Sequence, residues 1–146
     1  MRFFLLMLAL VVTINHAASA QSAYPVSAEA RQSAFHFSEL YNLDADQTES
    51  IANIEARLER HLATILTLRQ TDSRQYLEKL QAAFLGREHS IKNVLDSSQL
   101  DDFTRDAKWM RTRRAEQRIE TVQAGGSLAE AEEKALSLTW EADPAR

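Results

Sequence analysis

The densest charge in the sequence lies between Arg105 and Arg118. This segment holds six basic and two acidic residues, together with one tryptophan and one methionine. Residues three or four positions apart share a helix face, so Arg111, Arg114 and Arg118 are expected on one side of a helix. Such a surface attracts acidic chains through long-range electrostatics, and methionine and tryptophan side chains hold apolar groups adaptably.

Two interpretations of this basic segment are open. In the first, it is an exposed surface that binds other protein chains. Its candidate contact residues are then Arg105, Lys108, Trp109, Arg111 and Arg114. In the second, the charges are a solvated helix face, while Trp109 and Met110 belong to the core.

No catalytic or metal-binding set is predicted. His36, His61 and His89, the histidines that follow residue 20, are never three or four positions apart, so no single-helix metal pair exists. The chain has no cysteine, which removes disulfides, thiolate ligands and a thiol nucleophile. Gly-x-Ser-x-Gly, His-Glu-x-x-His and phosphate-loop motifs are also missing from the sequence. We therefore expect a protein that is no enzyme and has no cofactor.

The N-terminal residues predict export. Arg2 precedes an apolar run over residues 3–14, and Ala18-Ser19-Ala20 offers the small residues that a signal peptidase requires. A membrane-spanning helix needs roughly 20 apolar residues, more than this run provides. We predict a signal peptide over 1–20, cleaved near Ala20, with no stable membrane insertion afterwards; the alternative is an uncleaved anchor. The net charge of −4 argues against nucleic acid as a partner.

The apolar spacing predicts an all-α fold without strands. After an extended leader at 21–26, apolar residues recur in steps of three and four, which is the helical period. The expected helices cover residues 28–41, 45–70, 73–95, 97–124 and 128–138. Gly86 marks a bend or a close helix contact within the third helix, or it is a tolerated weak spot. Gly125-Gly126 is expected to cap the fourth helix.

Two helix starts share one pattern. Leu43-Asp44-x-x-Gln47 opens the second helix, and Leu95-Asp96-x-x-Gln99 opens the fourth. An aspartate at the N-cap accepts hydrogen bonds from free backbone N–H groups, and a glutamine three residues later can reach back to the cap N–H. The leucine before each cap can pack onto the first turn. The site residues of this repeat are Leu43, Asp44, Gln47, Leu95, Asp96 and Gln99.

With these two segments the chain resembles the Spy/CpxP family of periplasmic helical proteins, whose repeated motif is Leu-Thr-x-x-Gln. Asp44 and Asp96 stand where the family has threonine, and aspartate caps a helix equally well. The resemblance covers about residues 35–115. It implies a long antiparallel helical hairpin with shorter flanking helices that dimerises into a curved cradle. A thin hairpin also leaves apolar surface that a second copy could cover, which favours a homodimer.

The resemblance also implies a function in the periplasm. The expected activity is that of an ATP-independent chaperone that binds unfolded or stressed client proteins. The alternative is a stress-responsive or metal-responsive regulator that binds the periplasmic domain of a sensor kinase. A related branch of the family binds zinc. A purely structural envelope protein is a third option.

The last segment of the chain is acidic. Residues 130–143 contain five acidic side chains and one lysine. We expect residues 27–124 to form the helical hairpin domain and residues 125–146 to form an acidic C-terminal helix and tail. This segment could fold back over the basic helix, pair with a second subunit, or remain an exposed acidic helix.

Overall fold

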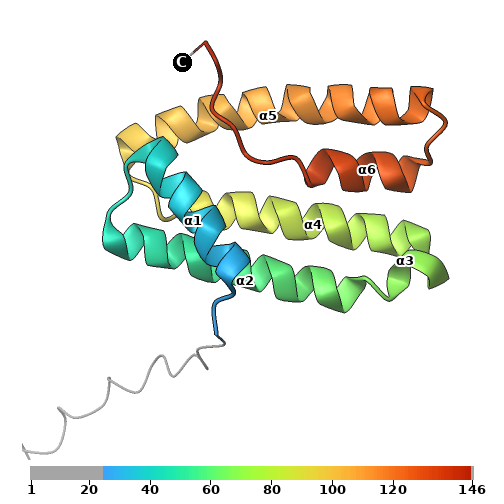
Figure 1. The fold of residues 1–146 in the computed structure, drawn as a ribbon, viewed down its shortest axis with the longest axis horizontal. Helices are drawn as coiled ribbons and strands as arrows, with labels where there is room; N and C mark the ends of the chain where they lie inside the picture. Colours follow the sequence, from blue (N-terminus) through green and yellow to red (C-terminus); the bar gives the residue numbers. More distant parts are fainter. Residues whose placement is uncertain (1–24, 146) are drawn as a thin grey trace, which may run out of the picture.

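The computed structural model describes residues 25–145, and this part of the chain is all-α, as predicted (Figure 1). It contains no strand, and its helices are α1 (Ala28–Tyr41), α2 (Ala45–Ile65), α3 (Leu68–Thr71), α4 (Ser73–Lys92), α5 (Ser97–Gln123) and α6 (Leu128–Leu136). The predicted signal peptide at 1–20 and most of the predicted leader lie outside the described residues.

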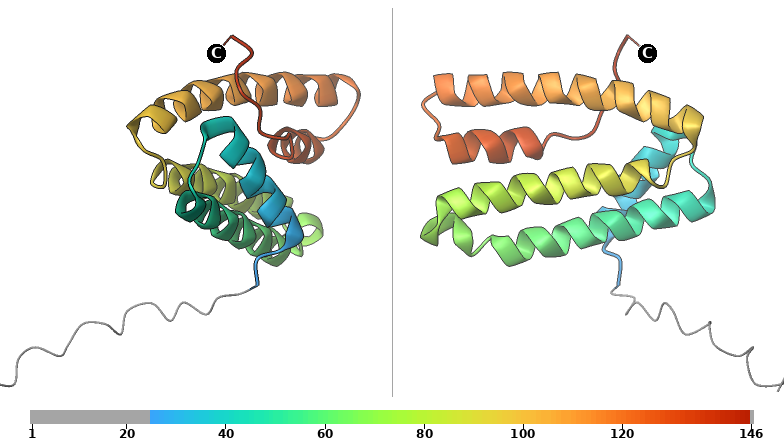
Figure 2. Two further views of the ribbon diagram at one scale, coloured as in Figure 1. Left: turned by 60° about the vertical axis from the view of Figure 1, so that its left-hand side comes forward. Right: turned by 180° about the vertical axis from the view of Figure 1, so that it is seen from behind.

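The helices form two antiparallel pairs. α2 lies beside α4, with α3 at the turn between them, and α5 lies beside α6 (Figure 1). α1 crosses α2 obliquely and also contacts α5, at the end of the molecule where the chain passes from α4 to α5 (Figure 2). The two motif helices, α2 and α5, begin at this same end. α2 is paired with α4 and α5 with α6, and the two motif helices are not paired with each other.

Both predicted motif caps are present. Asp44 and Asp96 have extended backbones and precede α2 and α5, and each helix start is a complete capping box. The Asp44 Oδ1 accepts from the Gln47 backbone N–H at 2.8 Å, and the Gln47 Oε1 accepts from the Asp44 N–H at 3.1 Å. These bonds satisfy N–H groups that a helix start otherwise leaves without partners.

Three predicted helices end earlier than the apolar pattern suggested, and one of them is α4, which ends at Lys92 instead of residue 95. α2 ends at Ile65, and residues up to Thr71 form the separate short helix α3. Asp72 separates α3 from α4, because it caps α4 by accepting from the Gln75 N–H at 2.9 Å and has a non-helical backbone. The last helix ends at Leu136 instead of Leu138. Beyond α6, Leu138 packs against the main core as part of the tail, whereas Leu66, directly after α2, is 56% exposed.

The α5–α6 turn follows the predicted glycine cap. Gly125 has φ 86°, a left-handed conformation that glycine adopts without a steric penalty. The Gly126 N–H donates to the Thr121 carbonyl at 2.9 Å, and the Gly125 N–H donates to the Val122 carbonyl at 3.0 Å. This pair of bonds is a Schellman motif. Ser127 and Glu130 then form the capping box of α6.

The main core lies where α1, α2, α5 and the C-terminal tail meet. Phe37 and Phe103 are fully buried, and Trp140 from the tail stacks on Phe103 with ring centroids 4.7 Å apart. A second cluster between α2, α4 and α6 contains Ile65, Tyr76, Leu80 and Leu136. The segment after residue 124, predicted as a separate C-terminal part, thus contributes side chains to both clusters.

Candidate functional site

The outer face of α5 carries the exposed part of the predicted basic surface. Arg105, Lys108 and Arg111 are exposed. Arg105 binds the neighbouring Asp102, whereas Lys108 forms no ion pair with another residue of the described part of the chain. Arg111 lies 3.8 Å from Glu88, measured from guanidinium nitrogen to carboxylate oxygen, with 59% of its side chain exposed. We define these three residues as the outer basic face.

Trp109 and Met110 do not extend this face. Met110 is 1% exposed and belongs to the main core, as the second interpretation of the basic segment proposed. Trp109 is half-buried and packs against the same core, and Arg113 lies over its ring at 5.9 Å from the centroid. Apolar contact with another chain would therefore have to use other side chains.

Arg111, Arg114 and Arg118 share one side of α5, as their spacing predicted. All three line a cleft between α4, α5 and α6 that we call the arginine cleft, with a volume of about 380 Å³. The opposite walls present Phe84 and Leu85, and Leu85 is 68% exposed. The remaining lining residues are Gln81, Glu88, Glu132 and Leu136.

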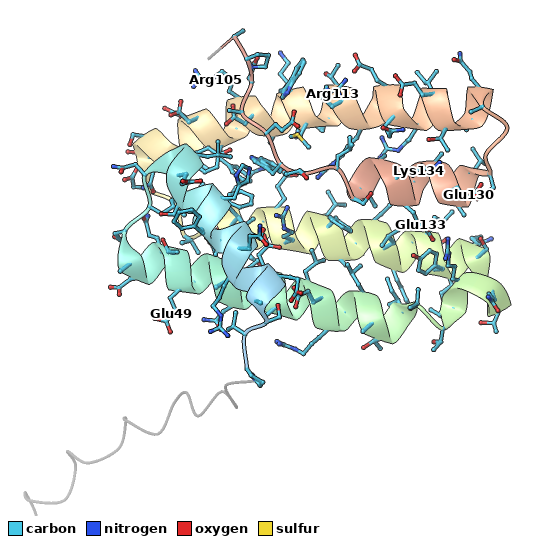
Figure 3. All side chains as sticks on the ribbon, in the orientation of Figure 1. Glu49, Arg105, Arg113, Glu130, Glu133 and Lys134 are labelled. Atoms are coloured by element: carbon cyan, nitrogen blue, oxygen red, sulfur yellow. The ribbon has the colours of Figure 1, made fainter. Side chains whose placement is uncertain are left out.

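The acidic helix α6 folds back over the basic helix, which was one of the predicted alternatives. Arg118 donates to Glu132 through Nε at 2.5 Å and through a terminal nitrogen at 3.0 Å. The Arg118 hydrogen bond lowers the pKa of Glu132 and raises that of Arg118. Glu133 binds Arg69 at 2.7 Å, which attaches α6 to α3 as well. Figure 3 labels Glu130, Glu133 and Lys134 on α6 and Arg105 and Arg113 on α5.

Arg114 lies deeper than its neighbours on α5. Its Nε is buried and has no hydrogen-bond partner among the described residues. Burial is the largest influence on Arg114 and lowers its pKa, with the charge of Arg87 as the next contribution. Arg114 therefore differs from Arg118, whose charge is matched by Glu132.

A second cavity lies on the other side of Arg114. We call it the tail cavity, because residues 136–140 form one of its walls; its volume is about 520 Å³. α1 contributes His36 and Phe37, α2 contributes Glu55 and α4 contributes Arg87. Phe84, Arg114 and Leu136 line both this cavity and the arginine cleft.

An ion pair that could not be predicted from the sequence forms part of the wall of the tail cavity. Arg87 donates to both Glu55 oxygens, from Nε at 2.9 and 3.0 Å and from a terminal nitrogen to Oε1 at 2.6 Å. Both side chains are about nine-tenths buried. The Arg87 guanidinium also lies 5.2 Å from the Phe37 ring centroid and 6.0 Å from that of Trp140. α2, α4, α1 and the tail are thus held together at one point.

The tail is fixed by a buried hydrogen-bond network. The Trp140 Nε1 donates to the Tyr41 hydroxyl at 2.6 Å, and that hydroxyl donates to the Asp106 Oδ2 at 2.9 Å. The Asp143 N–H donates to the Asp106 Oδ1 at 3.0 Å, and His36 contacts the Trp140 carbonyl at 2.6 Å. One signal was available in the sequence, since Asp106 is three positions from Phe103 and four from Met110, on the apolar side of its helix.

The two motif glutamines contact each other directly. The Gln47 Nε2 donates to the Gln99 Oε1 at 2.7 Å, and the Gln99 Nε2 donates to the Gln47 Oε1 at 3.1 Å. The Gln47 Nε2 also donates to the Val94 carbonyl at 3.0 Å. Leu43 is buried and Leu95 packs against the main core. The repeat thus joins the starts of α2 and α5.

Two properties of residues 25–145 bear on the remaining function classes. No group of three or more His, Cys, Asp or Glu side chains in this range could hold a metal ion. His61 and His89 are both exposed and line the same shallow pocket between α2 and α4. Within the same range, no helix has the length and apolar character needed to cross a membrane.

Comparisons with known proteins do not assign the chain. No family model, no curated protein and no solved structure matches it. The resemblance to the Spy/CpxP family therefore rests on the two motif segments.

Proposed function

We propose that this protein is an ATP-independent chaperone that acts in the periplasm and binds unfolded or stressed proteins. The proposal rests on one observation. The outer basic face continues into the arginine cleft, where the arginines of α5 lie opposite Phe84 and Leu85 of α4. Unfolded segments present both acidic and apolar side chains, so a surface of this composition complements them.

The charges and the apolar side chains would have different roles. Exposed cations such as Lys108 and Arg111 accelerate encounter with acidic chains, because long-range attraction raises association rates. Leu85 and Phe84 would then contact apolar groups of the client across the cleft. Such contacts are individually weak, which suits a chaperone that must release its clients without nucleotide hydrolysis.

Two further expectations belong to this proposal. The N-terminal signal peptide would deliver the protein outside the cytoplasm, where its cysteine-free composition makes folding independent of redox conditions. Homodimerisation would cover Ile119 and Val122, which are 57% and 45% exposed on α5. The runner-up function, binding of a sensor-kinase domain as a stress regulator, would use the same exposed face for a single folded partner.

Suppression of aggregation of a chemically denatured client tests the proposal. The purified protein should suppress light scattering at equimolar or small molar excess without ATP. Charge reversal of the outer basic face by Lys108→Glu together with Arg111→Glu should reduce protection severalfold for an acidic client. The matched control is Arg74→Glu with Lys79→Glu, which changes the same charge at exposed positions of α4.

The outcomes separate the candidate functions. Full protection by the control variant and reduced protection by the α5 variant support a chaperone surface on α5. Absence of protection by the wild-type protein at a severalfold excess refutes the chaperone proposal and favours the regulator.

A further inference from the structure

The tail cavity has the composition of a small-molecule site. Its volume of about 520 Å³ lies within the range of roughly 300–1,000 Å³ that is usual for ligand pockets. Six of its lining side chains are apolar or aromatic: Phe37, Leu58, Phe84, Leu136, Leu138 and Trp140. Exposed Glu29, Gln32 and Thr139 also line it, so the cavity reaches the protein surface at that side.

Arg114 brings a buried polar atom to the wall of this cavity. Its Nε is buried without a hydrogen bond among the described residues, and its guanidinium carbon lies 6.0 Å from the Trp140 ring centroid. Buried polar atoms in folded proteins are nearly always hydrogen-bonded, so an exception at a cavity wall calls for an explanation. A guanidinium in this situation is suited to receive an anion through two parallel hydrogen bonds.

The carboxylates around Arg114 are already bound to other cations. Glu55 binds Arg87, and Glu132 binds Arg118. Glu88 binds Lys92 at 2.9 Å and lies 3.8 Å from Arg111. Glu88 and Glu132 still attract Arg114 through space, but no carboxylate of residues 25–145 forms an ion pair with it.

We propose that the tail cavity binds a small apolar monocarboxylate, with Arg114 as the group that receives the carboxylate. The apolar part of the ligand lies against Phe84, Leu136 and Trp140. A single guanidinium without an ion-pair partner among residues 25–145 favours one negative charge, and Glu29 on the same wall disfavours a dianion such as phosphate. The tail cavity contains none of the three residues of the outer basic face, although it shares Phe84, Arg114 and Leu136 with the arginine cleft. Its test measures binding of a small molecule, so its outcome is distinguishable from that of the chaperone test.

Titration with octanoate tests the site directly, using Trp140 as a fluorescent reporter. Trp109→Phe leaves Trp140 as the only tryptophan and removes a buried N–H that has no hydrogen-bond partner within residues 25–145. Octanoate should change the Trp140 emission to saturation. Octanamide has the same chain but no charge, and it should bind at least tenfold more weakly; inorganic phosphate should not compete. Equal affinity for octanoate and octanamide, or no saturable response, overturns the proposal. This test leaves Arg114 in place.

Arg114→Met, made in the same single-tryptophan background, tests the assigned residue. The variant should keep its helical circular dichroism, because it replaces a desolvated cation by an apolar side chain of similar length. Its octanoate affinity should fall at least tenfold, towards that of octanamide. Lys108→Met serves as the control on the outer side of α5 and should bind octanoate like the parent. Unchanged affinity in Arg114→Met overturns the assignment.

Discussion

The glutamines of the repeated motif have two functions in the same side chain. Each closes a capping box through its carbonyl oxygen. Each also donates its amide N–H to the carbonyl oxygen of the other glutamine, at the end of the molecule where α2 and α5 begin. The bond from Gln47 to the Val94 carbonyl adds the segment that leads into α5. Because local and long-range bonds share these atoms, the start of α2 and the start of α5 should form cooperatively.

Glutamine pairing predicts energetic coupling between the two motifs. Gln47→Ala and Gln99→Ala should each destabilise the protein by about 1–2 kcal/mol, since each removes a cap bond and one or more inter-helix hydrogen bonds. The double variant should be less destabilised than the sum, with a coupling of roughly 0.5–1.5 kcal/mol in urea unfolding. Gln75→Ala with Gln47→Ala is the control pair, and strict additivity of the motif pair would contradict the account.

Gly86 offers a stabilising substitution. A Cβ at this position meets no atom within 4 Å, so the glycine is neither a close helix contact nor a steric requirement. Gly86→Ala should raise the free energy of unfolding by roughly 0.5–1 kcal/mol, because alanine restricts the unfolded chain and favours a helix interior.

Gly126→Ala provides the contrasting control for thermal and urea unfolding. A Cβ there would lie 2.7 Å from the Thr121 Cγ2 and 2.9 Å from the Thr121 carbonyl oxygen. This variant should be destabilised, and a gain in stability equal to that of Gly86→Ala would contradict the packing of the α5–α6 turn.

At the scale of elements, sequence reasoning succeeded where structure is local. α2, α5 and α6 each follow an aspartate or serine N-cap that stands three residues before the glutamine or glutamate of its capping box. This spacing is visible in the sequence. The position of Trp140 could not be read this way. It follows the last helix, and its burial depends on Phe103 and Tyr41, which are close only in the folded chain.

The same distinction applies to the candidate site. The shared face of Arg111, Arg114 and Arg118 follows from helical spacing, and the three do line one cleft. Of these three, only Arg114 has no ion pair with another of the described residues. This could not be predicted, because it depends on Glu132 binding Arg118 and on Glu55 binding Arg87. Pairing of charges between helices is a property of the packing and has no signature within one helix.

The stability of the protein should depend on pH through three carboxylates, two of them on α6. The pKa values of Asp96 and Glu130 are lowered by backbone hydrogen bonds at their helix starts, and that of Glu132 is lowered by Arg118. A carboxylate with a depressed folded-state pKa stabilises the protein above its ordinary pKa and loses this contribution as pH falls through the folded-state value. Stability should therefore be constant near neutral pH and decline as the pH falls below about 4.5.

Glu132→Gln isolates the contribution of α6 to this pH dependence. The variant should be less stable than the wild type at pH 7, and the difference should shrink as the pH falls towards 3 in urea unfolding. Lys134 is exposed on the same helix, so Lys134→Gln serves as a control. A difference for Glu132→Gln that grows on acidification would contradict the assigned ion pair.

At the scale of the whole molecule, an apolar stripe on α5 remains uncovered. Ala115, Ile119 and Val122 follow the four-then-three spacing of a helix–helix seam, and all three are exposed. In the predicted homodimer, a second copy of the chain would cover this stripe. This stripe lies next to the outer basic face, so dimerisation would place two such faces close together.

Sedimentation velocity tests the predicted homodimer. Ile119→Glu should shift the protein to a monomer at micromolar concentration, because it would place a charge in an apolar seam. Leu66→Glu changes a residue that is 56% exposed elsewhere, at the end of α2, and should leave the association unchanged. A wild-type protein that sediments as a monomer over this range would contradict the dimer.

Charge on the outer face of α5 is proposed to capture unfolded chains. The association rate of an unfolded acidic client tests this proposal most directly. Stopped-flow measurements should show a rate that falls with added salt, since exposed charges are screened over about 10 Å at 0.1 M. Lys108→Glu with Arg111→Glu should lower the low-salt rate at least tenfold and flatten its salt dependence. A rate that is insensitive to salt and unchanged in this variant would contradict the claim.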